Sequence, residues 1–235
     1  MEILVAVAKV GKYATSSSGD TVEVVERPGG GVSVVLADGQ SSGIGAKAIS
    51  SMVVRKVIAL LSEGVRDGAA ARAASDSLYT ERKGKVSATL NILSVDLQTS
   101  TLVITRNNPA PVLLAQGEKI MSLDAECKPV GVYRDTRPVI SEIPLETGLT
   151  VVVYTDGLIH AGSRSGEVMD VMTCLKASLE EGDPHPQSIA DALLEHAMKL
   201  DQGRPVDDTS VVVMRTRGNW GDEVRRLSMR IPFGP

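Results

Sequence analysis

Aspartates stand at the ends of four apolar segments of the chain, a placement that suits a hard metal ion. The segment VSVVLA runs into Asp38 and VVVYT runs into Asp156, and each of these aspartates is followed by glycine. Asp20 precedes TVEVV, and the pair Asp207 and Asp208 precedes TSVVVM. Carboxylates at the ends of buried strands are held rigidly and can converge at one edge of a sheet. Oxygen ligands of this kind are preferred by Mg²⁺ and Mn²⁺.

The other single residues and motifs give weaker signals. His160, His185 and His196 are scattered along the sequence, so surface or packing roles are predicted for them rather than a zinc site. A single Asp-Gly pair is usually a turn, and an aspartate before a strand is common in loops. The repeated conjunction of an apolar strand with an aspartate is what favours a metal site over unrelated turns.

The glycines after Asp38 allow a second interpretation. Gly39, Gly43 and Gly45 form a G-x-x-x-G-x-G pattern, which is typical of the cofactor turn of short-chain dehydrogenases. That turn requires a βαβ unit, with an acidic residue about 20 positions further on at the end of a second strand. Here the turn follows a predicted antiparallel hairpin, its helix leads into a second helix, and Glu63 lies at a helix end. The metal site is therefore preferred to a dinucleotide site.

Periodicity places these motifs on strands and helices in a definite order. Hairpins come first, then two helices, further hairpins, two more helices and one last strand. This order differs from the alternation that makes a parallel sheet, and it predicts an α+β fold of two antiparallel sheets with helix pairs outside. The predicted helices are 44–63, 67–82, about 166–181 and about 186–201; strands pair across the turns 28–31 and 116–118, and the last strand is 209–216.

Composition limits the classes of function. The chain has 235 residues, of which 43% are hydrophobic and 23% charged, as is ordinary for a soluble globular protein. Its net charge of −4 provides no basic surface for nucleic acid. No apolar run approaches the roughly 18 residues that a membrane span requires. Two cysteines, Cys127 and Cys174, make no disulfide framework, so a reducing cytoplasm is predicted.

Taken together, five segments resemble the PP2C-type (PPM) metal-dependent Ser/Thr phosphatases, most closely their bacterial branch of SpoIIE, RsbU and RsbX. The segments are GDTVEVV, VVLADGQSSGIGAKAISS, SATLNILSVDLQTSTLVITRNNPAPVLL, LTVVVYTDGLIHAG and DDTSVVV, in the family's order. The resemblance implies a four-layer αββα sandwich with a binuclear Mg²⁺ or Mn²⁺ centre at one end of the two sheets. It covers about residues 3–216, so a phosphatase domain is expected over 1–217 and a C-terminal tail over 218–235.

The resemblance also implies which residues form the site. Matched to the family's motifs, the catalytic aspartates are Asp38, which bridges the two ions, Asp156 and Asp207; the metal ligands are these three with the Gly39 carbonyl, Asp208 and Asp20. Two positions depart from the family's pattern. Gln40, Ser41 and Ser42 make the glycine loop two residues longer than usual. His160 occupies a position that is often acidic, which is expected to alter metal affinity or the surroundings of the ligands.

The implied activity is hydrolysis of phosphoserine or phosphothreonine by a water that the metal ions activate. No protein nucleophile is needed, and the C-x₅-R loop of tyrosine phosphatases is absent because six residues separate Cys127 from Arg134. The implied partners are small phosphorylated regulatory proteins of the STAS-domain or stressosome type, met by a cytoplasmic monomer. Because the predicted domain begins almost at residue 1, the expectation is closest to a stand-alone RsbX-type phosphatase.

The alternative is a catalytically weak pseudophosphatase that acts as a regulatory binding module. Loss of any of Asp38, Asp156 or Asp207 would favour this alternative, and all three are present. The enzyme is therefore the preferred hypothesis.

Overall fold

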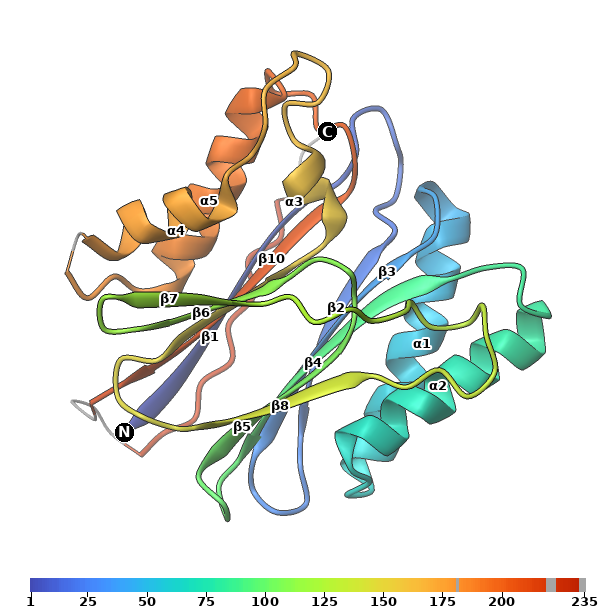
Figure 1. Ribbon diagram of the computed structural model, residues 1–235, viewed down its shortest axis with the longest axis horizontal. Helices are drawn as coiled ribbons and strands as arrows, with labels where there is room; N and C mark the ends of the chain where they lie inside the picture. The colour runs from blue at the N-terminus through green and yellow to red at the C-terminus, as the bar shows by residue number, and fades with distance from the viewer. Residues whose placement is uncertain (181, 219–222, 233–235) are drawn as a thin grey trace.

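Two five-stranded sheets lie face to face in the computed structural model, which describes residues 1–180, 182–218 and 223–232 (Figure 1). In spatial order, the first sheet consists of β1 (Glu2–Val10), β10 (Thr209–Arg217), β9 (Thr150–Tyr154), β6 (Val112–Gln116) and β7 (Lys119–Leu123). The second sheet consists of β2 (Asp20–Glu26), β3 (Val32–Gly39), β4 (Ala88–Asp96), β5 (Thr101–Asn107) and β8 (Val139–Pro144). All neighbouring strands run antiparallel.

Helices cover the outer face of each sheet, so the molecule has four layers (Figure 1). The second sheet is covered by α1 (Gly43–Ser62) and α2 (Asp67–Arg82), and the first by α4 (Val171–Glu180), α5 (Pro186–Leu200) and the short α3 (Asp156–His160). The predicted αββα sandwich of antiparallel sheets is confirmed. None of the helices among the described residues has the length and apolarity that a membrane crossing requires.

The central strands are apolar on both faces because both faces of each sheet are covered. In β3, Val34 and Leu36 pack between the two sheets, whereas Val35 and Ala37 pack against α1 and α2. The alternation of side chains along a strand therefore contributes to two cores at once. This explains why VSVVLA, LTVVVY and SVVVM are continuous apolar runs without a period of two.

The observed elements differ from the predicted ones mainly after β9. Residues 156–160 form α3, where the sequence predicted only the end of a strand, and α4 begins at Val171 rather than near residue 166. The predicted end of that helix at residue 181 lies outside the described residues.

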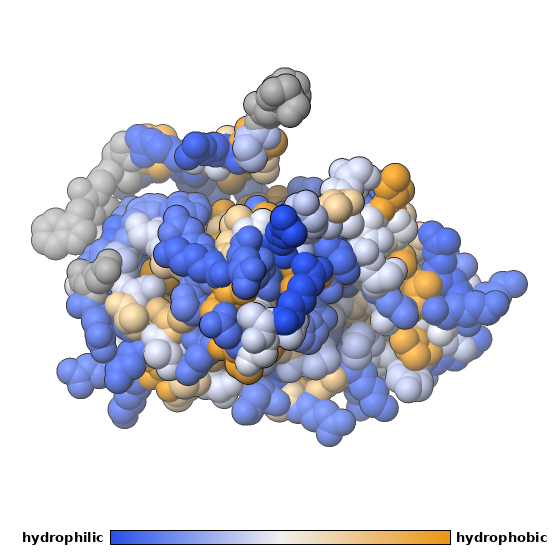
Figure 2. Space-filling view, turned by 90° about the horizontal axis from the view of Figure 1, so that it is seen from above, coloured by the Kyte–Doolittle hydropathy of each residue, from blue (hydrophilic) through white to orange (hydrophobic). Residues whose placement is uncertain are grey.

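The predicted tail, 218–235, is described only in part, since 219–222 and 233–235 lie outside the described residues. Residues 223–232 form neither helix nor strand, and their apolar side chains are exposed (Figure 2).

Candidate metal centre

Four strand ends meet at one end of the sandwich. Antiparallel pairing of β2 with β3 sets Asp20 directly opposite Asp38. Asp156 follows β9 as the first residue of α3, and Asp207 comes just before β10, the strand beside β9. Asp38, Asp156 and Asp207 line one cavity of about 370 Å³. The structure thus brings together the three aspartates that the sequence indicated as catalytic.

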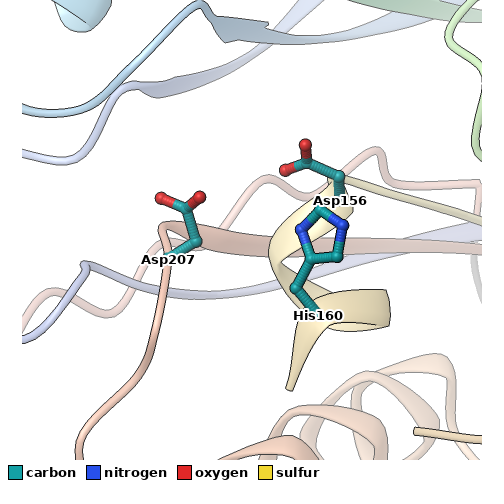
Figure 3. A group of neighbouring side chains, drawn as sticks. All are labelled: Asp156, His160 and Asp207. Carbon is teal, nitrogen blue, oxygen red and sulfur yellow. The ribbon is translucent and has the colours of Figure 1, made fainter. Parts of the chain in front are cut away.

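His160 lies close to two of these aspartates, Asp156 and Asp207 (Figure 3). One carboxylate oxygen each of Asp156 and Asp207 and one ring nitrogen of His160 lie within 4.8 Å of one another. Asp156 and His160 are four residues apart on α3, which places them on the same face of that helix. As an isolated histidine, His160 was predicted to have a surface or packing role, whereas the family resemblance placed it where an acidic residue often stands and expected it to affect metal affinity. The D-x-x-x-H spacing would have indicated the second role from the residues alone, had the short helix been expected.

Asp20 lies beside Asp38 as a fully buried carboxylate. Its Oδ2 accepts hydrogen bonds from the hydroxyl of Thr155 at 3.0 Å and from that of Ser210 at 2.6 Å. Its Oδ1 has no hydrogen-bond partner among the described residues. A buried carboxylate oxygen without a donor is costly. Because burial and also a hydrogen bond with Asp20 raise the pKa of Asp38, this oxygen can be met by a proton on Asp38 or, in its place, by a cation.

Two lysines hold the backbone next to this carboxylate. Lys9 and Lys47 both donate to the carbonyl oxygen of Asp20, Lys47 at 2.8 Å. Burial and the neighbouring charge of Lys47 lower the pKa of Lys9. The two ammonium groups bring positive charge near the aspartates, although neither is among the described residues that line the cavity.

Asp208 is engaged by the backbone. Its Oδ1 accepts a hydrogen bond from the Lys12 amide at 2.9 Å, and its Oδ2 accepts one from the Gly19 amide at 2.8 Å. These bonds fasten both ends of the loop 11–19 to the start of β10. Among the described residues, Asp208 is not part of the cavity lining. The structure therefore separates Asp208 from Asp207, with which the sequence grouped it.

Crowding and burial favour the protonated forms of the carboxyls. Burial, and then the negative charges of Asp20 and Asp156, raise the pKa of Asp38 to about 9. Burial also raises the pKa of Asp156, against the opposing effect of His160. Burial likewise raises the pKa of Asp20. With a pKa of about 9, Asp38 keeps a proton at neutral pH that a bound cation can displace.

Both Asp-Gly motifs require glycine because another backbone passes too close for a side chain. A Cβ at Gly39 would lie 2.1 Å from the carbonyl oxygen of Ala46 on α1. A Cβ at Gly157 would lie 2.1 Å from the carbonyl oxygen of Asp208. The first contact sets β3 against α1, and the second sets α3 against the start of β10. The two glycines thus allow the elements that carry the aspartates to pack closely.

The lengthened glycine loop is hydrogen-bonded to Ser87, the residue before β4. The Gln40 amide donates to the carbonyl of Ser87 at 2.9 Å, and the Gln40 side chain accepts from the Ser87 amide at 3.0 Å. Ser41 has φ +74°, and Ser42 precedes α1 without a hydrogen bond from its side chain to the helix. The first turn of α1 contains no acidic residue. Its amide groups, at the edge of the cavity, therefore favour an anion.

The fold is that of the PP2C-type serine/threonine phosphatases. The PP2C phosphatase domain of SpoIIE from Bacillus subtilis, solved with a fragment of its regulatory domain, superimposes with a TM-score of 0.79 and 21% identity, over 92% of this chain and 63% of that one. RsbX in complex with magnesium superimposes with a TM-score of 0.68 and 16% identity, over 90% of this chain and 94% of that one.

The sequence places the chain more closely. Residues 28–217 match the family of Stage II sporulation protein E (SpoIIE), and the chain belongs to this family. Stage II sporulation protein E of Bacillus subtilis (strain 168) is 24% identical over 203 residues, which are 86% of this chain and 24% of that protein. The chain spans 24% and 36% of the lengths of the two curated relatives that it matches.

Proposed function

We propose that the chain hydrolyses phosphoserine and phosphothreonine esters with the help of bound Mn²⁺ or Mg²⁺. The observation that carries the proposal is the convergence of Asp38, Asp156 and Asp207 in one cavity. Partly buried carboxylates that repel one another are a poor arrangement unless a cation is bound among them. Membership of the SpoIIE family and the PP2C fold support the same activity.

The residues of the cavity fit a divalent cation. The three aspartates and the carbonyl of Gly39 offer oxygen ligands, as hard cations prefer. The Oδ1 of Asp20, which accepts no hydrogen bond among the described residues, and a nitrogen of His160 lie next to this set. When bound, divalent cations supply positive charge for a phosphate and a water of lowered pKa.

Other groups of the chain prepare the cavity for a phosphate. The Lys12 ammonium lines it, with Nζ 3.7 Å from Oδ1 of Asp207. The Asp208 carboxylate accepts the Lys12 amide, so the residues just before β10 position both the Lys12 ammonium and Asp207 at the cavity. The uncapped N-terminus of α1 adds amide groups on another side. A phosphate monoester dianion in the cavity would therefore meet positive charge beside the aspartates.

We place the physiological substrates among small phosphorylated regulatory proteins of the STAS-domain or stressosome type, met by a monomeric cytoplasmic enzyme. The similarity to SpoIIE and RsbX supports this class. Two large side chains that stand within two residues of the cavity lining in the sequence are also exposed: Ile44 is 75% exposed and Tyr13 is 53% exposed. Such side chains suit contact with a protein better than contact with a small ester.

The test is phosphate release from p-nitrophenyl phosphate and from a phosphorylated STAS-domain protein, each with Mn²⁺ and with EDTA. We expect both substrates to be hydrolysed only with the metal. Asp207→Asn should abolish this hydrolysis, whereas Asp76→Asn, which removes an exposed carboxylate on α2, should not. Hydrolysis in EDTA would contradict the metal site. Hydrolysis of the small ester alone would contradict the proposed substrate class and leave the activity standing.

A further inference from the structure

A second cavity, of about 380 Å³, lies in the loop 124–138 that joins β7 to β8. The loop contains no helix, and it passes beside α2 before it returns to β8 (Figure 1). Loops of more than about 12 residues without helix or strand are uncommon in compact domains, and those that are ordered usually have a function. This cavity shares no lining residue with the aspartate cavity, so the proposed metal site does not explain it.

The loop is held in a fixed shape. The side-chain amide of Asn107 donates to the carbonyl of Lys128 at 2.9 Å and to that of Arg137 at 3.5 Å, which joins the two sides of the loop. Between them, Val130 is fully buried and pairs with Ala88 of β4. The cavity is therefore preformed rather than dependent on a mobile segment.

Three cations line this cavity, and none has a carboxylate partner in the part of the chain that the structure describes. Among the described residues, no carboxylate oxygen lies within 4.0 Å of the charged nitrogens of Lys128, Arg134 or Arg137. Instead, Nζ of Lys128 lies 4.8 Å from the ring centroid of Tyr133, and Cζ of Arg134 lies 5.2 Å from that of Tyr79. Aromatic rings orient a cation without neutralising its charge. These charges are thus positioned and available.

The remaining lining indicates what kind of ligand fits. The lining contains two carboxylates, Glu126 and Asp135, against the three cations. It is therefore net positive on a chain whose net charge is −4. Tyr133 adds a ring that is 55% exposed. Exposed tyrosine and arginine together are typical of protein interfaces. The lining suits a polypeptide segment rich in Asp and Glu.

The cavity adjoins the metal centre through one backbone pair. The amide and carbonyl of Val130 exchange hydrogen bonds with those of Ala88, at 2.9 and 3.1 Å. Ala88 lines the aspartate cavity, and Lys128 is two residues from Val130. Ala88 and Lys128 are therefore separated by one hydrogen-bonded pair and two steps along the chain. Because one extended residue spans at most about 3.6 Å, a peptide of a few residues can reach from one cavity to the other.

We propose that Lys128, Arg134 and Arg137 bind an acidic segment of the phosphoprotein substrate while its phosphate lies at the aspartates. The inference rests on the proposed function and adds a preference to it. Substrates with Asp or Glu near the phosphorylated residue are favoured over those with neutral residues there.

The test compares two phosphoserine peptides that differ only in having Asp and Glu, or Asn and Gln, beside the phosphoserine. The triple variant Lys128→Gln, Arg134→Gln, Arg137→Gln should raise KM for the acidic peptide by about tenfold, as expected for three partly exposed charge pairs. Its kcat, its KM for the neutral peptide and its activity on p-nitrophenyl phosphate should stay unchanged. The matched control is Arg55→Gln, Lys56→Gln, Arg72→Gln, which removes the same charge from exposed positions on α1 and α2.

Equal losses for the two peptides, or the same change in the control, would overturn the proposal. Arg137→Glu is a second variant that leaves both tyrosine contacts intact. It should favour a peptide with Lys and Arg at the same positions over the acidic one. Fluorescence anisotropy of the labelled acidic peptide distinguishes a failure of this proposal from a failure of the proposed function. Wild type should bind the peptide more tightly than the triple variant, whether or not it hydrolyses it.

Discussion

At the residue scale, the carboxylates of Asp207 and Asp208 meet different partners. The oxygens of Asp208 accept two backbone amides of the loop 11–19, and the residue is 3% exposed. The side chain of Asp207 is 34% exposed and lines the cavity. Although they are neighbours in the chain, the two carboxylates therefore have different surroundings. We therefore propose a structural role for Asp208 and keep Asp207 as a ligand candidate.

This difference predicts that substitution of Asp208 mainly affects stability and substitution of Asp207 mainly affects activity. Asp208→Ala leaves the buried Gly19 amide and the partly buried Lys12 amide without this acceptor, and hydrogen bonds to a charged group contribute about 1.5–3 kcal/mol each. We expect it to lower the free energy of unfolding by about 3 kcal/mol in urea with EDTA present. Asp207→Ala should cost clearly less stability but abolish metal-dependent hydrolysis. Equal losses of stability would contradict these assignments.

Asp38 predicts a pH dependence whose sign follows from its pKa. Burial and the neighbouring aspartates raise this pKa from 3.8 to about 9 in the folded chain. Between these values the folded chain keeps a proton that the unfolded chain has released, so the free energy of unfolding falls as pH rises. Below about pH 4 both states are protonated and the penalty vanishes.

The measurement is thermal unfolding of wild type and Asp38→Asn in EDTA between pH 5 and pH 9. The variant, which cannot ionise, should become increasingly more stable than wild type as the pH rises. Mn²⁺ should stabilise wild type most at high pH, because it competes with protons for the carboxylate. A difference between the two proteins that does not grow with pH would contradict the raised pKa.

At the scale of elements, the three glycines around the start of α1 have different roles. A Cβ at Gly39 would meet the backbone of Ala46, Gly43 has φ +75°, and a Cβ at Gly45 would meet nothing within 4 Å. Their spacing in the sequence is equally compatible with a dinucleotide turn and with a metal site. Only the packing of α1 against β3 shows which glycine the site requires.

Gly39→Ala and Gly45→Ala therefore form a matched pair. The first should force α1 away from β3 and lower the free energy of unfolding by about 3 kcal/mol or more, with loss of metal binding. The second replaces glycine with alanine at an open position inside a helix and should raise that free energy by up to about 1 kcal/mol. Urea unfolding measures both. A neutral Gly39→Ala would show that the close approach of strand and helix is not needed.

The short helix α3 shows why the place of His160 in the site followed from the family resemblance and not from the residues alone. A helix that ends four residues after Asp156 leaves no periodic pattern to detect. Without that helix, the four-residue spacing to His160 carries no meaning. The contact with Asp207 depends in turn on the pairing of β9 with β10, which is long-range in the sequence.

At the scale of the whole molecule, the layers were predictable because each layer leaves a local pattern. Strands covered on both faces, such as β3, β9 and β10, are continuous apolar runs, and the covering helices show apolar residues at helical spacing. The aspartates at the strand ends were predictable for the same reason, because each stands at the end of one of these apolar runs. The loop 124–138 left no such pattern, because its shape depends on the distant side chain of Asn107 and on the buried Val130.

The most direct test of the central claim is hydrolysis of a phosphoserine peptide at pH 8 by wild type and by Asp38→Asn, with Mn²⁺ and with EDTA. Wild type should release phosphate only with Mn²⁺, and the variant should be slower by about a hundredfold or more, since even groups that only support a metal ligand cost up to that much. Release of phosphate at the wild-type rate by Asp38→Asn, or in EDTA, would contradict a metal-dependent phosphatase built on the strand-end aspartates.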